Sequence, residues 1–173
     1  RGGDGAVAKA VLKANLAGEN LVRLDAWRPF GTGFVRAGQA VLCDNADATD
    51  AVRGVTQSVE LNQTRPEPIV ATAWSKAAGV SGSSGSDYAV YLDLTYQDNT
   101  PLWGQASAFA VGTHDWERRQ VVVLPQKPVK RLAFHLLFRK HGGKAGVRDP
   151  EVRVIHTPER FADFHGVPIR PRG

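Results

Sequence analysis

The chain has 173 residues, of which 42% are hydrophobic and 23% are charged, and its formal net charge is +5 at pH 7. These values are typical of one folded domain with a sizeable core, and they exclude global disorder. No run approaches the roughly 20 apolar residues of a membrane-spanning helix, and no signal peptide is recognisable. The chain starts at Arg1 and contains no Met, so we expect it to be an excised or processed piece of a longer protein.

The positive charge lies mostly near the C-terminal end. Residues 1–135 contain 14 Lys and Arg against 13 Asp and Glu, whereas residues 136–173 contain 8 against 4. A nearly neutral body is a poor match for an extended phosphate-binding face. We therefore expect neither nucleic acid nor a membrane as a partner.

The chain divides into three stretches. Residues 1–18 are a lead-in rich in Ala and Gly, in which Ala6–Leu16 is either a short helix or loose chain. Residues 19–156 alternate short β-type runs with turn residues, and residues 157–173 form either a linker toward a further domain or a strap across the surface. The expected strands are Leu21–Leu24, Phe34–Val35, Ala40–Cys43, Val55–Leu61, Ile69–Lys76, Tyr88–Tyr96, Arg118–Val123, Arg131–Arg139 and Val152–Ile155. Many short strands with little helix between them predict an all-β, antiparallel β-sandwich.

Three of these strands alternate clearly enough to assign their two faces, because strand side chains alternate with period two. In Tyr88–Tyr96 and Leu132–Arg139 the apolar sets belong in the core, and in Ile69–Lys76 a small apolar set does. The positions that then face outward include Trp74, Tyr91, Asp93, His135 and Arg139. If the three strands share one sheet, these side chains lie on one open surface.

Such a surface suits sugar recognition, because aromatic rings stack on the apolar faces of sugars and planar polar groups pair with hydroxyls. Trp103 and Gln105, in a loop after a turn, are further candidates. The alternatives are that a loop or another domain covers the outward rings, and that Trp103 plugs one end of the sandwich. Trp27 and Trp116 are expected to cap the core.

Catalytic and cysteine chemistry have little support in the sequence. Cys43 is the only cysteine, and it lies in a strand-like run, so it is expected to be a small buried hydrophobe. The serines lie in a Gly/Ser loop without a nucleophile elbow, and the five histidines lack zinc-binding spacing. Asp93 has no evident carboxylate partner for glycoside hydrolysis. We therefore expect that the chain is not an enzyme.

The stretch from Asn20 to Val154 resembles carbohydrate-binding modules of the family 4/9 type. The resemblance rests on the order and spacing of Asn20-Leu21-Val22, Trp27-Arg28-Pro29-Phe30, Ala37-Gly38-Gln39-Ala40-Val41, Ala71-Thr72-Ala73-Trp74-Ser75-Lys76-Ala77, Tyr91-Leu92-Asp93-Leu94-Thr95-Tyr96-Gln97-Asp98, Thr113-His114-Asp115-Trp116-Glu117 and Gly143-Lys144-Ala145-Gly146-Val147-Arg148-Asp149. It implies a jelly-roll sandwich that binds an oligo- or polysaccharide for a larger secreted enzyme, such as a glycoside hydrolase or polysaccharide lyase. It also implies a structural calcium, for which Asp25 and Asp149 are the nearest equivalents of the usual acids.

Two readings of function are favoured at this point over a third, a small lyase or hydrolase. In the first, the chain is a non-catalytic carbohydrate-binding module whose site residues are Trp74, Tyr91, Asp93, Trp103, Gln105, His135 and Arg139. In the second, the same sandwich is a structural or interaction module, packed against a catalytic domain of its parent protein, with no glycan binding of its own.

Overall fold

A computed structural model describes residues 17–156, 163–164 and 167–168. The described part is built from strands, and no helix occurs in it. The expected lead-in at residues 1–16, with its candidate helix, and most of the expected linker or strap at 157–173 lie outside the described residues. No described helix is long and apolar enough to cross a membrane.

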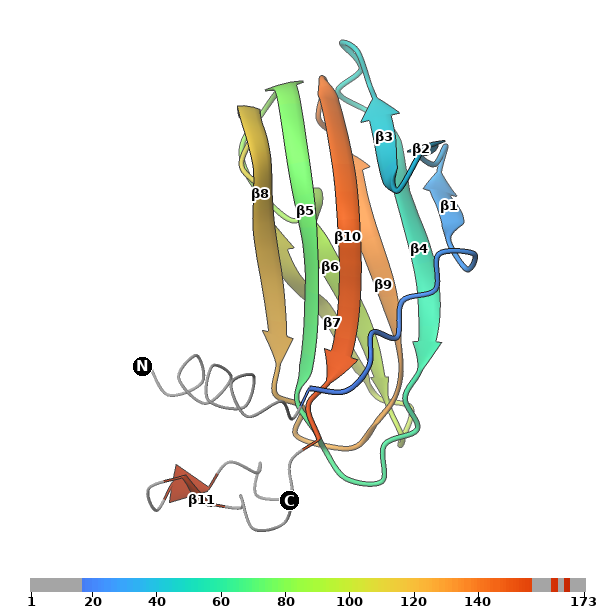
Figure 1. The fold of residues 1–173 in the computed structure, drawn as a ribbon, viewed down its shortest axis with the longest axis vertical. Helices are drawn as coiled ribbons and strands as arrows, with labels where there is room; N and C mark the ends of the chain where they lie inside the picture. The colour runs from blue at the N-terminus through green and yellow to red at the C-terminus, as the bar shows by residue number, and fades with distance from the viewer. Residues whose placement is uncertain (1–16, 157–162, 165–166, 169–173) are drawn as a thin grey trace.

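Two five-stranded antiparallel sheets pack face to face (Figure 1). The first sheet has the order β1-β4-β9-β6-β7 and the second the order β2-β3-β10-β5-β8. The strands are β1 (Arg28–Gly31), β2 (Val35–Ala37), β3 (Ala40–Asp44), β4 (Val52–Glu60), β5 (Ile69–Val80), β6 (Tyr88–Tyr96), β7 (Pro101–Ala108), β8 (Gly112–Val123), β9 (Val129–Arg139), β10 (Lys144–Val154), and a separate short pair of β11 (Asp163–Phe164) and β12 (Val167–Pro168). The expected all-β sandwich of the jelly-roll type is therefore confirmed.

The core fills the space between the two sheets, and the alternation of apolar residues places it there. On β6 the buried set is Val90, Leu92 and Leu94, and on β9 it is Leu132, Phe134 and Phe138 with Leu136. The ring of Trp27 packs edge-on against Phe134 at 5.6 Å between centroids, which confirms the expectation that Trp27 caps the core. Cys43 is 1% exposed, as expected, and burial raises the pKa of its thiol to about 11.

The expected strand at Leu21–Leu24 is wrong. Only Leu21 donates a backbone hydrogen bond to β10, to the carbonyl of Val152. The backbone of Arg23 bonds instead to the side-chain amide of Gln57, and the chain turns where the N–H of Ala26 meets the carbonyl of Arg23. A side chain thus replaces the neighbouring strand, and the first strand begins later, at Arg28.

The sequence did not predict strand β7, and it predicted only the last part of strand β10. Strand β7 begins at a proline and is bulged opposite β6 between Leu92 and Leu94, features that suit an edge strand. In β10 the pairing with β5 shifts between Arg148 and Glu151, and Asp149 there has a φ of +52°. These irregularities break the period-two pattern on which the expectation relied.

Candidate functional site

The outer face of the first sheet, called here the first-sheet face, brings together four of the predicted site residues. Tyr91 of β6 lies directly opposite His135 of β9, and His135 lies opposite Thr56 of β4. Opposite residues of an antiparallel pair share a face. Asp93 and Arg139, at even spacing from Tyr91 and His135, lie on it too. The expectation that the β6 and β9 residues share a surface is thus met by the backbone register.

Asp93 is held on both of its carboxylate oxygens. Its Oδ1 accepts the backbone N–H of Gly104 at 2.9 Å, and its Oδ2 lies 3.2 Å from Nε2 of His135. Gly104 belongs to the bulged part of β7 and has a φ of +74°. Asp93 therefore fixes the edge strand against β6, next to the exposed Trp103.

His135 is a partly buried imidazole, with 13% of its side chain exposed. Burial lowers its pKa, while Asp93 acts in the opposite direction with a smaller effect. The neutral ring has one donor and one acceptor, so donation from Nε2 to Asp93 leaves Nδ1 as an acceptor. Nδ1 is buried and has no hydrogen-bond partner among the described residues.

Aromatic and cationic groups surround His135. The ring of Tyr91 lies 5.8 Å from it, and the ring of Phe30, from β1, lies 5.6 Å away on an edge. The guanidinium of Arg139 lies 5.8 Å from the centre of the Phe30 ring, and its Nε donates to Asp87 at 2.6 Å. Phe30 and Asp87 were not predicted as site residues, because only the pairing of β1 with β4 brings Phe30 to this face.

Trp103 and Gln105 lie in strand β7 rather than in the loop expected from the sequence. Trp103 is 68% exposed to solvent, so its ring does not plug the end of the sandwich. Gln105 is paired with Leu92, which faces the core, and its amide donates to the carbonyl of Trp103. Trp103 thus stands at the rim of the first-sheet face, whereas Gln105 supports the edge from the inner side.

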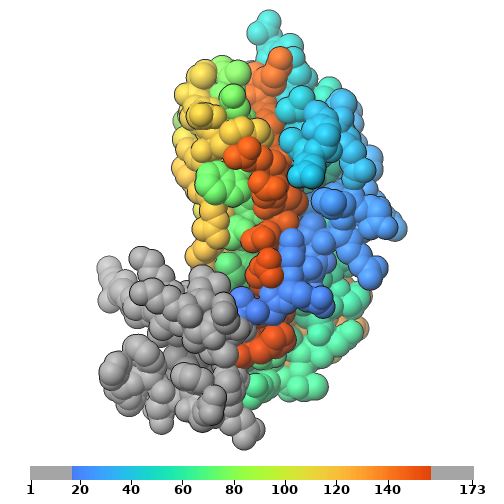
Figure 2. Space-filling view, viewed as in Figure 1, coloured from blue at the N-terminus to red at the C-terminus, as the bar shows by residue number. Residues whose placement is uncertain are grey.

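The placement of Trp74 with the other site residues is wrong, because β5 belongs to the second sheet. On the outer face of that sheet, called here the second-sheet face, the guanidinium of Arg148 lies 4.2 Å from the ring centre of Trp116 and 5.8 Å from that of Trp74. Trp116 lies on this face and not on the core as expected. Figure 2 views the molecule from this side, with the N-terminal segment crossing β10.

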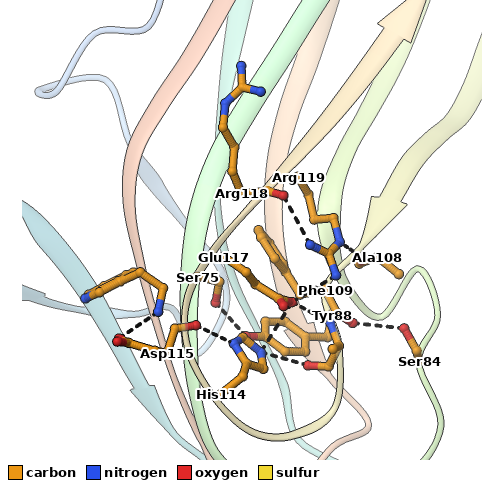
Figure 3. Close-up of polar contacts among 12 residues, drawn as sticks. Ser75, Ser84, Tyr88, Ala108, Phe109, His114, Asp115, Glu117, Arg118 and Arg119 are labelled. Carbon is orange, nitrogen blue, oxygen red and sulfur yellow. Dashed lines mark hydrogen bonds and ion pairs between the residues drawn. The ribbon is translucent and has the colours of Figure 1, made fainter.

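Two polar clusters lie close together near β5, β6 and β8 (Figure 3), one buried and one at the edge of the sandwich. The hydroxyl of Tyr88 lies 2.5 Å from Oγ of Ser75, which also donates to the carbonyl of Gly146. Burial raises the pKa of Tyr88 to about 12. At the edge, Glu117 accepts the N–H of Ala110 and pairs with Arg119 at 3.1 Å. The groups within each cluster satisfy one another's hydrogen bonds, so we assign both clusters to the stability of the fold.

The structure does not test the calcium site expected at Asp25 and Asp149. Calcium takes six to eight oxygen ligands, yet no group of three or more His, Cys, Asp or Glu suited to a metal occurs among the described residues. The carboxylate of Asp149 lies 3.6 Å from Nε of Arg148. Calcium therefore stays a prediction, which melting temperatures measured with calcium chloride and with a chelator would test.

No family model matches this chain. Over 97 residues it is 31% identical to the tRNA nuclease WapA of Bacillus subtilis strain 168, a match that covers 54% of this chain and 4% of that protein. A tRNA(Glu)-specific nuclease WapA of Bacillus subtilis subsp. natto is 31% identical over 96 residues, again 4% of its length. The chain thus spans a small fraction of the curated relatives that it matches.

Solved structures share the fold at low sequence identity. The CBM22-1 xylan-binding domain of Paenibacillus barcinonensis Xyn10C has a TM-score of 0.53 at 13% identity, covering 82% of this chain and 98% of that one. A CBM4 structure has a TM-score of 0.51 at 11% identity, covering 79% and 94%. Tailspike protein 4 of bacteriophage CBA120 has a TM-score of 0.54 at 10% identity, covering 79% of this chain and 21% of that one. The chain has the fold of carbohydrate-binding modules.

Proposed function

We propose that the chain is a non-catalytic carbohydrate-binding module that uses the first-sheet face. The observation that carries the proposal is the clustering of Tyr91, His135, Phe30 and Arg139 on one outer face, with exposed Trp103 at its rim. Half-buried rings give sugars an apolar platform, and the polar groups around them pair with hydroxyls. The fold shared with carbohydrate-binding modules supports this function by analogy.

The chain would serve a longer secreted protein as an accessory domain of the family 4/9 type that the sequence resembles, and it would have no enzymatic activity of its own. The matched relatives are far longer than the matched segment, which agrees with a module inside a large chain. We propose no nuclease activity for it, because the segment similar to the tRNA nucleases is only 4% of their length.

A glycan-array screen of the folded domain, followed by titration of the best ligand, tests the proposal. Tyr91→Ala combined with Trp103→Ala should weaken binding at least tenfold, because stacked aromatic rings carry much of the energy at such surfaces. Trp74→Ala, on the opposite sheet, is the matched control and should leave affinity unchanged. The proposal would be contradicted if the double variant bound the glycan as tightly as the unmodified domain. It would also be contradicted if the unmodified domain bound no glycan on a broad array.

A second candidate function has its own observation, on the second-sheet face. Val35 and Leu42 are 66% and 41% exposed, and Leu42 lies opposite Gly146, beside which Trp116 packs. Exposed aliphatic side chains beside tryptophans suit contact with another domain. In that case Trp74→Ala would lower the stability of the parent protein while glycan binding stayed absent.

A further inference from the structure

The acidic groups of the first-sheet face are already engaged by the protein itself. Both oxygens of Asp93 have partners, in Gly104 and His135. Asp87 accepts from Nε of Arg139 on one oxygen, and Nζ of Lys140 lies 4.0 Å from the other. A ligand that needs hydrogen-bond acceptors or negative charge from this face therefore meets carboxylates that are largely satisfied.

The arginines of the same face keep unused hydrogen-bond donors, although only 27% of the Arg139 side chain is exposed. Arg139 donates to Asp87 from Nε, and its two terminal nitrogens make no hydrogen bond within the described part of the chain. Arg28 of β1 is exposed, and no described residue pairs with its guanidinium. The free hydrogen-bonding capacity of the face is thus made mainly of arginine donors.

The register places these two arginines around the aromatic cluster. Arg28 lies opposite Thr56, which lies opposite His135, so Arg28, Thr56, His135 and Tyr91 form one row across four strands. Strands lie about 4.8 Å apart, so the row spans about 14 Å. Phe30, two residues after Arg28, holds the Arg139 guanidinium near its ring. Arg28 thus lies at the β1 end of the row, Arg139 approaches Phe30 from β9, and Tyr91 lies toward the rim with Trp103.

We propose that the first-sheet face selects acidic glycans, with Arg28 and Arg139 binding a carboxylate or sulfate group while the sugar rings pack on Tyr91 and Trp103. The inference rests on the proposed glycan-binding function and names its ligand class. A guanidinium offers parallel N–H donors in a planar fork that matches both kinds of anion. A neutral glycan would leave both forks unused.

The test compares four ligand types by calorimetry with the folded domain. They are a uronic-acid oligosaccharide such as oligogalacturonate, a sulfated one such as a chondroitin sulfate fragment, a neutral one such as xylohexaose, and single-stranded RNA of similar charge. We expect the acidic oligosaccharides to bind at least tenfold more tightly than the neutral one. The comparison of carboxylate with sulfate identifies which anion fits.

Arg28→Gln is the informative variant, because Arg28 is exposed and its loss leaves no described acid unpaired. It should weaken binding of the acidic oligosaccharide about tenfold and leave the neutral one unchanged. Arg118→Gln is the matched control, since it removes the same charge from an exposed position opposite Trp74 on the second sheet. Arg139→Lys keeps the charge and its contact with Asp87, yet it should still weaken binding because the fork is lost.

The outcomes separate this inference from the function beneath it. Tighter binding of the neutral glycan, with Arg28→Gln without effect, would overturn the acidic preference and leave glycan binding intact. Equal losses in Arg28→Gln and Arg118→Gln, or RNA bound as tightly as the acidic glycan, would reveal general polyanion attraction and overturn it as well. Failure of every oligosaccharide to bind would overturn the proposed function itself.

Discussion

The two outer faces carry similar aromatic and charged residues, but they differ in how many of those side chains are already bound by other parts of the protein. On the first-sheet face the acids are paired internally, while the ends of Arg28 and Arg139 and the ring of Trp103 stay open. On the second-sheet face Arg148 of β10 places its guanidinium 4.2 Å from the ring centre of Trp116 and 5.8 Å from that of Trp74, so the protein itself supplies a partner to both rings. The ring of Trp103 is therefore more open to a ligand than the rings of Trp74 and Trp116, which already have Arg148 as a partner.

The largest effect expected from this contrast is that of Asp93→Ala. The variant removes two contacts of an ionised acceptor, one to the Gly104 N–H and one to His135. We expect urea denaturation to show that the free energy of unfolding falls by about 2 kcal/mol, within the range for charged hydrogen bonds. We also expect glycan affinity to fall, because β7 and Trp103 lose their attachment to β6. Glu60→Ala on the same sheet, with a half-exposed ion pair to Arg131, should cost under about 0.5 kcal/mol. Equal losses in both would contradict a positioning role for Asp93.

Arg148→Ala addresses the other face. Loss of the stacked guanidinium should lower the free energy of unfolding by about 1 to 2 kcal/mol, since cation–π contacts are worth up to about 2 kcal/mol when partly desolvated. Glycan affinity should not change. Lys144→Ala, on the same strand and with its side chain 59% exposed, is the control and should be nearly neutral. A drop in glycan affinity with Arg148→Ala would show that the two faces are not independent.

Gly104→Ala should have a smaller effect on stability. It distinguishes backbone strain from the role of the β7 bulge in shaping the site. A Cβ there would meet the Tyr91 hydroxyl at 3.4 Å, in a backbone conformation with φ +74°. We expect a loss of about 1 kcal/mol from the left-handed conformation, together with weaker glycan binding measured by titration. Gly38→Ala, with φ +62° and no atom within 4 Å of its Cβ, should show the strain without the binding loss. Unchanged affinity in Gly104→Ala would argue that the bulge does not shape the site.

The smallest expected effect is a dependence of stability on pH through His135. Its folded pKa is lowered by burial, so the unfolded chain binds the proton more readily. Stability is therefore complete above the unfolded pKa of about 6.5, and it declines as the pH falls from there through the folded pKa. His135→Gln keeps a donor for Asp93. This variant should reduce the change in melting temperature between pH 7.5 and pH 5. An unchanged slope would place the titration elsewhere.

The sequence predicted the sandwich and most of the core, because the alternation of apolar and polar residues in β6 and β9 can be recognised from the sequence alone. It also placed Tyr91, Asp93, His135 and Arg139 on outward positions of the right strands. It could not assign β5 to a sheet, since alternation sets the face of a strand but not its neighbours, and Trp74 was misplaced for that reason. Phe30 and Arg28 were missed as site residues because their position depends on pairing across about 25 residues of chain.

The entry and exit of the sandwich lie side by side at one end (Figure 1). Ala17 forms an antiparallel bridge with Ile155, and the N–H of Gly18 donates to the carbonyl of Val154. A pulling force applied at these two points would load the bonds one after another, as in opening a zipper, rather than all at once in shear. A force that pulls these two segments apart should therefore open the contacts of residues 17–21 with residues 152–155 first, before the strands of the two sheets are loaded.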